Sequence, residues 1–185
     1  MKKILFITTN AYKFSVAQKA LESSQVELEQ KALDYEVPEI QGFEVEEIAK
    51  WSASWVAEKL NEPVAVTDAG YYINSLNGFP GPYIKFINKW LNAGDILRLM
   101  DGKEDRSIEV RETLAYCEPG SEPIAFNGVA RGTIALKRGT ESNSPINELF
   151  IPEGSDRPMS EIEDEVMQKF WGDKLNNWIA LGKYF

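Results

Sequence analysis

Two periods of hydrophobic positions are present along the chain, and the first half predicts strands that alternate with helices. Short apolar runs that end in polar side chains indicate buried strands, and apolar side chains at helical spacing indicate amphipathic helices. The predicted strands are 2–8, 26–33 and 63–68, and the predicted helices are 10–23, which Asn10 would cap, and 44–60. This order is typical of an α/β fold.

The second half changes character. Residues 108–116 alternate with period two, 118–123 have turn composition, and 124–136 are again strand-like, which predicts a long antiparallel pair. Residues 69–82, rich in glycine and proline, are expected to form a loop. Since the chain contains no linker, repeat or low-complexity stretch, we expect residues 1–185 to form a single domain with two lobes.

The chain has no histidine, which restricts the chemistry available to it. Ser-His-Asp triads, Cys-His dyads and zinc sites with histidine ligands are all excluded. The single cysteine, Cys117, lies in an alternating stretch and is interpreted as a buried small hydrophobe. An enzyme of this composition must therefore use carboxylates, lysines, hydroxyls and a hard metal ion.

The net charge of −9 disfavours nucleic-acid polymers as partners. A small anionic substrate would need cations placed locally around it. No apolar run reaches membrane-spanning length, and the apolar run near the start is too short for a signal peptide. With one cysteine and no targeting segment, we expect a cytoplasmic protein with no membrane partner.

Polar clusters lie at the predicted strand ends or in the loops that follow them. They are Thr8, Thr9 and Asn10 with Lys13, then Glu39 with Gln41, and then Asp68. In open α/β sheets ligands gather at the carboxyl ends of strands, and a helix start there suits a phosphate group. Taken singly, each cluster has a simpler interpretation: a helix cap followed by a surface lysine, a polar loop, and a turn-forming aspartate.

The clusters have a joint interpretation if the first three strands lie side by side. Glu39 and Asp68 would then share one cleft with the segment 8–13. Two carboxylates hold Mg²⁺ well and leave positions for phosphate oxygens and water. This combination would serve phosphoanhydride hydrolysis, which needs charge neutralisation, an oriented water and a base.

Several short motifs follow one another along nearly the whole chain. They are Thr8-Thr9-Asn10-Ala11-Tyr12-Lys13, Glu39-Ile40-Gln41-Gly42, Thr67-Asp68-Ala69-Gly70, Leu76 to Tyr83, and Phe150, Pro152 and Gly154. In this order and spacing the sequence resembles the inosine triphosphate pyrophosphatase family. The resemblance implies an α/β protein with a mixed, strongly twisted sheet, flanking helices, and two lobes around a central cleft. It also implies a homodimer.

The resemblance further implies a Mg²⁺-dependent reaction that cleaves a nucleoside triphosphate into its monophosphate and pyrophosphate. The usual substrates are ITP, XTP and their deoxy forms, so the role is cleaning of the nucleotide pool. By match, Thr8, Asn10 and Lys13 would bind the triphosphate, with Thr9 beside them, and Glu39 would hold Mg²⁺. Asp68 would orient or deprotonate the attacking water, or would ligate the metal.

Departures from the family pattern are concentrated at particular positions. Thr67 replaces an acidic residue, Thr9 replaces a glycine, and Ser52 stands where a helix lysine is expected, with Lys50 close by. In the base-reading segment, Ile146 replaces a stacking aromatic and Asn147 an aspartate. Met167, Gln168 and Lys169 stand for the pattern S-H-R. Asn147, Gln168 and Lys169 are therefore candidate contacts to a base, with a shifted preference.

The interpretation that we favour is an active pyrophosphohydrolase with altered base preference. One alternative is a catalytically weakened relative that binds a nucleotide or a partner protein without turnover. Another is a pyrophosphatase that acts on a different anhydride. The retained Glu39, Asp68 and Lys13 favour the first.

Overall fold

The computed structural model describes residues 1–185 and contains a seven-stranded mixed sheet. Its strand order is β2-β1-β3-β5-β6-β7, with β4 paired to β3. Strand β1 pairs in parallel with β2 and β3, whereas β4 and β7 pair antiparallel with β3 and β6. The strands are β1 (Lys2–Ile7), β2 (Val26–Lys31), β3 (Val64–Ile73), β4 (Pro80–Gly81), β5 (Ser107–Cys117), β6 (Ile124–Ile134) and β7 (Phe150–Pro152). The prediction of a mixed α/β fold is confirmed.

Helices flank this sheet. They are α1 (Ala11–Leu21), α2 (Val45–Leu60), α3 (Ile84–Trp90), α4 (Ala93–Leu99), α5 (Asp164–Leu175) and α6 (Asn177–Tyr184). Short 3₁₀ segments are η1 (Asn74–Leu76), η2 (Pro145–Glu148) and η3 (Met159–Glu161). None of the helices combines the length and the apolar character that a bilayer crossing requires.

The chain forms two compact units. Unit 1 consists of Met1–Asp68, Glu112–Gly128 and Leu175–Phe185, and unit 2 consists of Ala69–Arg111 and Val129–Lys174. Strands β3, β5 and β6 each contribute residues to both units. The boundary in β3 falls directly after Asp68, the residue that ends the apolar run expected from the sequence.

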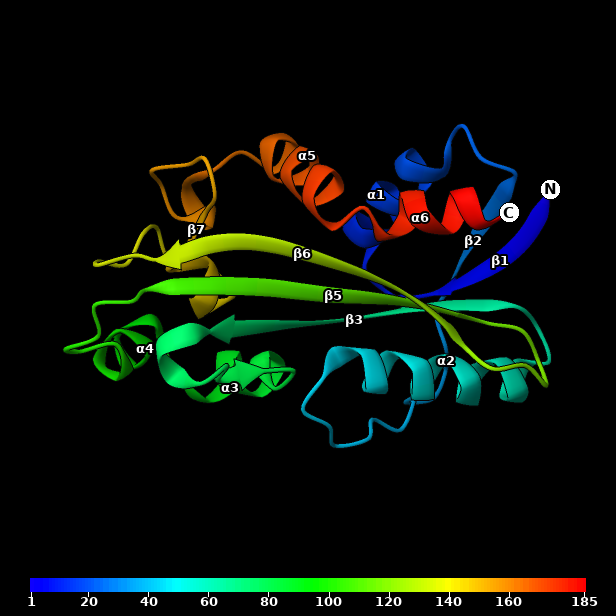
Figure 1. The fold of residues 1–185 in the computed structure, drawn as a ribbon, viewed down its shortest axis with the longest axis horizontal. Coiled ribbons are helices and arrows are strands. Elements are labelled where there is room, and N and C mark those ends of the chain that lie inside the picture. The colour runs from blue at the N-terminus through cyan, green and yellow to red at the C-terminus, as the bar shows by residue number, and fades with distance from the viewer. The chain divides into compact units, whose positions relative to one another are not determined.

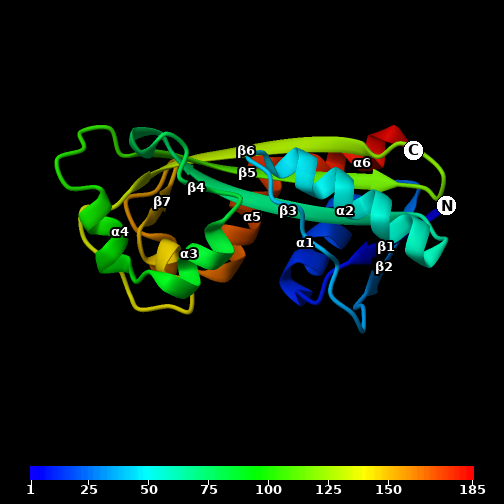
Figure 2. The same ribbon diagram turned by 90° about the horizontal axis from the view of Figure 1, so that it is seen from below.

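Unit 1 buries apolar side chains on both faces of its strands. Alternation along β1 sends Ile4 and Phe6 into a cluster that contains residues of α1 and α6, and Leu5 into a second cluster formed with α2. Helices α1 and α6 accordingly lie on one face and α2 on the other (Figure 1). Seen from below, α2 runs along the strands of unit 1 (Figure 2). The Trp178 ring meets Phe6 edge to face at a centroid distance of 4.6 Å, which fixes α6 on β1.

Unit 2 is organised around the ring of Phe150, which is fully buried. Tyr71 of β3 meets this ring edge to face at 5.9 Å, and Trp171 of α5 stacks on it at 5.8 Å. Phe170 adds a third aromatic contact. These contacts bring β3, β7 and α5 together within unit 2.

The expectation of a loop over 69–82 is wrong for its first part, because β3 continues to Ile73 and pairs with β4. Gly70 suggested a turn, yet its role is to allow a close backbone approach. A Cβ at this position would lie 2.8 Å from the Gly81 carbonyl group. A glycine within a strand often marks such an approach rather than a chain reversal.

Candidate functional site

The junction between β1 and α1 forms the first part of the site. Asn10 is the N-cap of α1, and its Oδ1 accepts the backbone N–H of Lys13 at 3.1 Å. The Thr8 hydroxyl in turn accepts the N–H of Asn10 at 3.1 Å. Gln30 on β2 donates to the Thr8 carbonyl oxygen at 3.1 Å. Thr8 and Asn10 thus both act as hydrogen-bond acceptors that order the chain at the positive end of α1.

Lys13 is more than a surface lysine after a cap. Its Nζ donates to Thr67 Oγ1 on β3 at 3.3 Å and lies 3.5 Å from Glu112 Oε2 on β5. The Lys13 side chain is 37% exposed, so the protein does not enclose it. The structure thus brings α1, β3 and β5 together around one cation.

Glu112 was missed by reasoning from the sequence, although a signal was present. Glu112 lies on the same face of β5 as Val110 and Leu114, and both of these neighbours are buried. A carboxylate in an apolar register must find polar partners. Glu112 Oε1 accepts a hydrogen bond from Asn177 Nδ2 at 2.8 Å, and Asn177 is only 3% exposed.

Asp68 and Glu39 both belong to unit 1. Alternation along β3 places Asp68 on the face of Val66, which packs against the cluster formed with α2. Glu39 is exposed in the segment before α2, and Val37 of this segment packs against the same cluster. Asp68 therefore belongs to the α2 side of the sheet, and the segment that carries Glu39 packs on this side through Val37, whereas Lys13 reaches β3 from the α1 side. A common site for Glu39, Asp68 and Lys13 stays a prediction.

The donors available suit a hard divalent cation. Mg²⁺ in phosphate-processing sites takes one or two carboxylates and completes its octahedron with substrate oxygens and water. Glu39 and Asp68 provide carboxylate oxygens of this kind. No group of three or more Asp, Glu, Cys or His side chains is arranged to enclose an ion. The carboxylate oxygens of Glu39 and Asp68 are thus of the chemical type that Mg²⁺ prefers.

The lysine expected on α2 has no direct equivalent. Ser52 is 6% exposed and faces the core. Lys50 Nζ lies 2.7 Å from Glu46 Oε1, and Glu46 Oε2 also accepts from Asn127 Nδ2 at 2.6 Å. The hydrogen bonds from Lys50 and Asn127 hold the pKa of Glu46 below its usual value. Lys50 is therefore already engaged by a carboxylate of its own helix.

The candidate base contacts all lie in unit 2. Ile146 is 1% exposed and contributes to the core, so it presents no surface on which a base could stack. Asn147 is half-buried in η2. On α5, Gln168 is half-buried, and Lys169 is exposed with its Nζ 2.8 Å from Asp173.

The segment that carries Asn147 is held by its buried neighbour Glu148. The Glu148 side chain is 4% exposed and pairs with Arg138 at 2.9 Å. Its other oxygen accepts the N–H of Ser142 at 3.0 Å. Asn147 is thus presented on a short segment with fixed ends.

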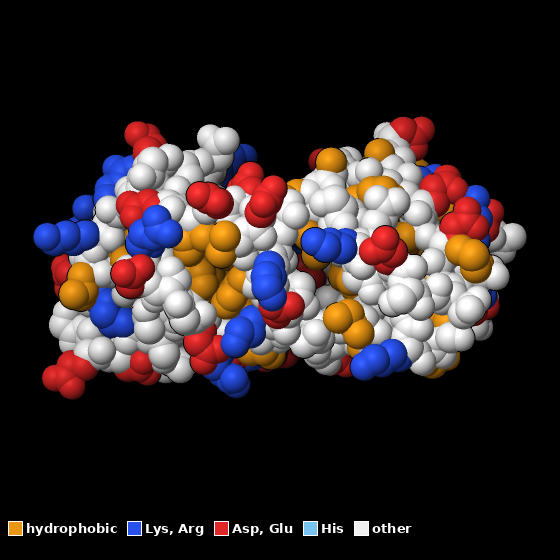
Figure 3. Space-filling view, turned by 90° about the horizontal axis from the view of Figure 1, so that it is seen from above, with side chains coloured by type: hydrophobic (Ala, Val, Ile, Leu, Met, Phe, Trp, Pro, Cys, Tyr) orange, Lys and Arg blue, Asp and Glu red, His pale blue; other side chains and the backbone are white.

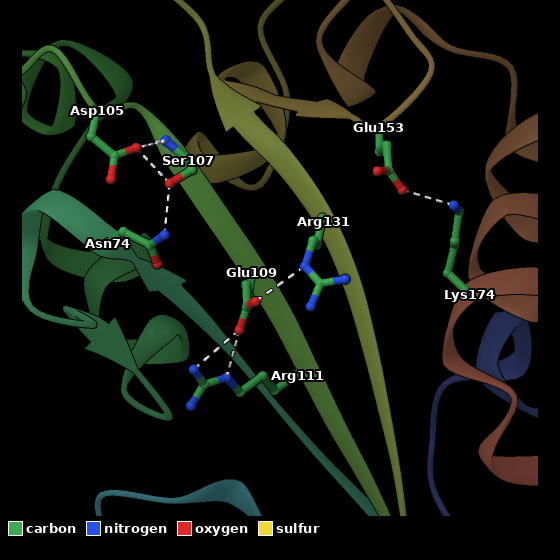
Figure 4. Close-up of polar contacts among 8 residues, drawn as sticks. All are labelled: Asn74, Asp105, Ser107, Glu109, Arg111, Arg131, Glu153 and Lys174. Atoms are coloured by element: carbon green, nitrogen blue, oxygen red, sulfur yellow. Dashed lines mark hydrogen bonds and ion pairs between the residues drawn. The ribbon is translucent and has the colours of Figure 1, made fainter.

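Unit 2 also contains a network of charged side chains that the sequence did not predict. Glu109 lies between Arg111, at 3.1 Å, and Arg131, at 3.3 Å (Figure 4). The Arg111 guanidinium carbon is 4.2 Å from the centroid of the Tyr72 ring. Acidic and basic side chains are likewise interspersed over the face in Figure 3. Arg111 and Arg131 are therefore each paired with an acidic side chain.

The chain is similar to a known protein family. The sequence profile of the Ham1 family matches residues 4–170. The dITP/XTP pyrophosphatase of Methanopyrus kandleri is 41% identical over 160 residues, which cover 86% of this chain and 84% of that protein. The protein of the same name from Methanosarcina mazei is 46% identical over 141 residues, or 76% of each chain.

A solved structure supports the same fold. The HAM1 protein from Coxiella burnetii is similar with a TM-score of 0.81 at 20% sequence identity, covering 100% of this chain and 98% of that one. The length of the profile match and the identity to curated relatives are sufficient to assign the family. The chain belongs to the Ham1 family.

Proposed function

We propose that this protein is a nucleoside triphosphate pyrophosphohydrolase, which converts a nucleoside triphosphate and water into the monophosphate and pyrophosphate. The observation that carries the proposal is the Lys13 ammonium at the start of α1, which is held by Thr67 and approached by Glu112. The names of the relatives, dITP/XTP pyrophosphatases, support the same activity. Its role is to remove unusual purine nucleotides from the pool.

Binding of the triphosphate falls to the β1–α1 junction. Lys13 supplies a positive charge, Asn10 supplies amide N–H donors, and Thr8 and Thr9 supply hydroxyls. The Asn10 cap keeps these groups at the positive end of α1, where phosphate oxygens are stabilised. Since the whole protein carries a net charge of −9, this local field must outweigh the overall repulsion of an anionic substrate.

Glu39 and Asp68 are the residues that would hold Mg²⁺. When bound, the ion supplies charge neutralisation at the phosphates and polarisation of the scissile bond. Asp68 is also a candidate to orient the attacking water and accept its proton, and the two roles predict different metal dependence. If Asp68 ligates the ion, Asp68→Asn raises the Mg²⁺ concentration needed for half-maximal rate. If Asp68 acts only as a base, the variant lowers kcat at an unchanged Mg²⁺ requirement.

Base preference is proposed to differ from the family pattern. Asn147, Gln168 and Lys169 offer amide and ammonium groups to a base edge. Ile146, which is buried, offers no stacking surface. A site whose hydrogen-bonding groups have changed loses its former discrimination, so we expect comparable rates for several purine triphosphates.

Further properties belong to the same proposal. We propose that the enzyme works in the cytoplasm as a homodimer, and that neither nucleic-acid polymers nor membranes are its partners. The family resemblance supports the dimer. The cytoplasmic location is supported because free nucleoside triphosphates are found in the cytoplasm.

The test is a rate measurement on purified protein with Mg²⁺ and a panel that contains dITP, XTP, ITP, the common nucleotides and modified pyrimidine triphosphates. The proposal predicts pyrophosphate release from at least one purine member and loss of that release in Asp68→Asn. If wild type and Asp68→Asn are equally inactive on every member, the hydrolase is refuted. Tight nucleotide binding without turnover would instead identify a binding protein.

A further inference from the structure

Glu112 and Asn177 connect the Lys13 ammonium to the C-terminal helix. The ammonium lies 3.5 Å from Glu112 Oε2, and Glu112 Oε1 accepts from Asn177 Nδ2 at 2.8 Å. Asn177 is the first residue of α6, and its own Oδ1 accepts the N–H of Trp178 at 2.9 Å. All of these residues lie in unit 1.

A lysine ammonium has three N–H donors on a flexible stem, so by itself it has little directional preference. Here Thr67 Oγ1 on β3 and Glu112 Oε2 on β5 attract it from two different strands. The hydrogen bond to Thr67 and the ion pair with Glu112 together restrict the directions in which the other N–H groups of the ammonium can point. Thr67 and Glu112 thereby orient the Lys13 ammonium as a hydrogen-bond donor.

Burial restricts the position of the Glu112 carboxylate. Its side chain is 13% exposed, and a carboxylate so far removed from water requires compensating donors. Asn177 is one donor, and the buried position of Asn177 fixes its direction. Trp178, next in the chain, packs on Phe6 of β1, the strand that leads into Thr8. The support for Glu112 is therefore rigid on the side away from Lys13.

We propose that Glu112 is a positioning residue that holds the Lys13 ammonium toward the polyphosphate of the substrate, with Asn177 fixing Glu112. The inference rests on the proposed function and deepens it. Glu112 touches no reacting atom. It acts through Lys13, whose ammonium contacts both Thr67 on β3 and Glu112 on β5.

The test is Glu112→Gln, which keeps the shape and the acceptor for Asn177 but removes the charge that holds Lys13. We expect KM for the preferred triphosphate to rise about fivefold, within the usual range for coupled neighbours, with kcat little changed. Glu118→Gln is the matched control, because Glu118 pairs with Lys2 at 2.9 Å and takes no part in the site. This control should leave KM unchanged.

A double-mutant cycle separates positioning from a merely structural role. If Glu112 acts through Lys13, then Glu112→Gln adds no further loss of affinity in a Lys13→Met background. A KM of Glu112→Gln within twofold of wild type, or below it, would overturn the inference. An equal loss in both backgrounds would overturn it too.

A second readout keeps the inference testable without turnover. Calorimetric titration with pyrophosphate and Mg²⁺ should show weaker binding to Glu112→Gln than to wild type, and circular dichroism should confirm that each variant is folded. If wild type hydrolyses no triphosphate, the proposed function fails, while the pyrophosphate titration still decides the role of Glu112. Equal pyrophosphate affinities of wild type and Glu112→Gln would contradict that role.

Discussion

Replacement of Lys13 by methionine should separate substrate binding from stability. The variant keeps the aliphatic stem and loses the ammonium, which donates to Thr67 and pairs with Glu112. A hydrogen bond to a charged group contributes about 1.5–3 kcal/mol, so one lost contact to phosphate corresponds to a rise in KM of about 10- to 150-fold. The assay is the initial rate of pyrophosphate release against triphosphate concentration at saturating Mg²⁺.

The same substitution should change stability only modestly. At 3.5 Å the gross attraction between Lys13 and Glu112 is about 5 kcal/mol for an effective dielectric constant of about 20. The Lys13 side chain is 37% exposed, and solvent screening with desolvation reduces the net value to about 1 kcal/mol. For a chain of this length that corresponds to a fall in Tm of about 2–4 °C.

Lys19→Met is the matched control. Lys19 lies on the same helix, is exposed, and its replacement changes the net charge by the same amount. Its KM should equal that of wild type. If Lys13→Met keeps the wild-type KM, or if Lys19→Met raises KM equally, then Lys13 does not bind the triphosphate and the reasoning is refuted.

Other predictions concern stability and reactivity. Because Lys50 and Asn127 lower the pKa of Glu46 in the folded state, Glu46→Gln should destabilise the protein near neutral pH. The difference should shrink as pH falls from the usual pKa of a glutamate through the lowered pKa of the folded state, as measured by urea unfolding against pH. Cys117 is 2% exposed, and burial raises the pKa of its thiol. A thiol reagent should therefore label Cys117 only after unfolding, and rapid labelling of the native protein would contradict its buried position. Trp178→Ala should lower the free energy of unfolding by about 3–5 kcal/mol, because it leaves a cavity against Phe6; a loss below about 1 kcal/mol would show that α6 is not held there.

Much of the fold was predictable because periodicity reports burial. The predicted helix 44–60 corresponds to Val45–Leu60, and the predicted start at Asn10 is confirmed by its cap. The error at 69–73 has a physical cause. The glycine and proline content of 69–82 predicts a loop, although at Gly70 the absence of a side chain serves the close approach of Gly81, a contact that local sequence does not reveal.

The site was predictable only where it is local in sequence. The Thr8, Asn10 and Lys13 contacts span a few residues, and the cap geometry follows from their spacing. The contacts of Lys13 with Thr67 and Glu112 depend on strand order, which a single sequence does not give. The burial of Ile146 is also tertiary, because it follows from packing within unit 2.

The central claim is cleavage that yields pyrophosphate, and ³¹P NMR of the products tests it most directly. Wild-type protein with Mg²⁺ and the most rapidly consumed triphosphate should give resonances of the nucleoside monophosphate and pyrophosphate in equal amounts. Lys13→Met and Asp68→Asn at the same enzyme concentration should give little of either. Formation of a nucleoside diphosphate and inorganic phosphate, or no consumption of any triphosphate by the wild type, would contradict the account.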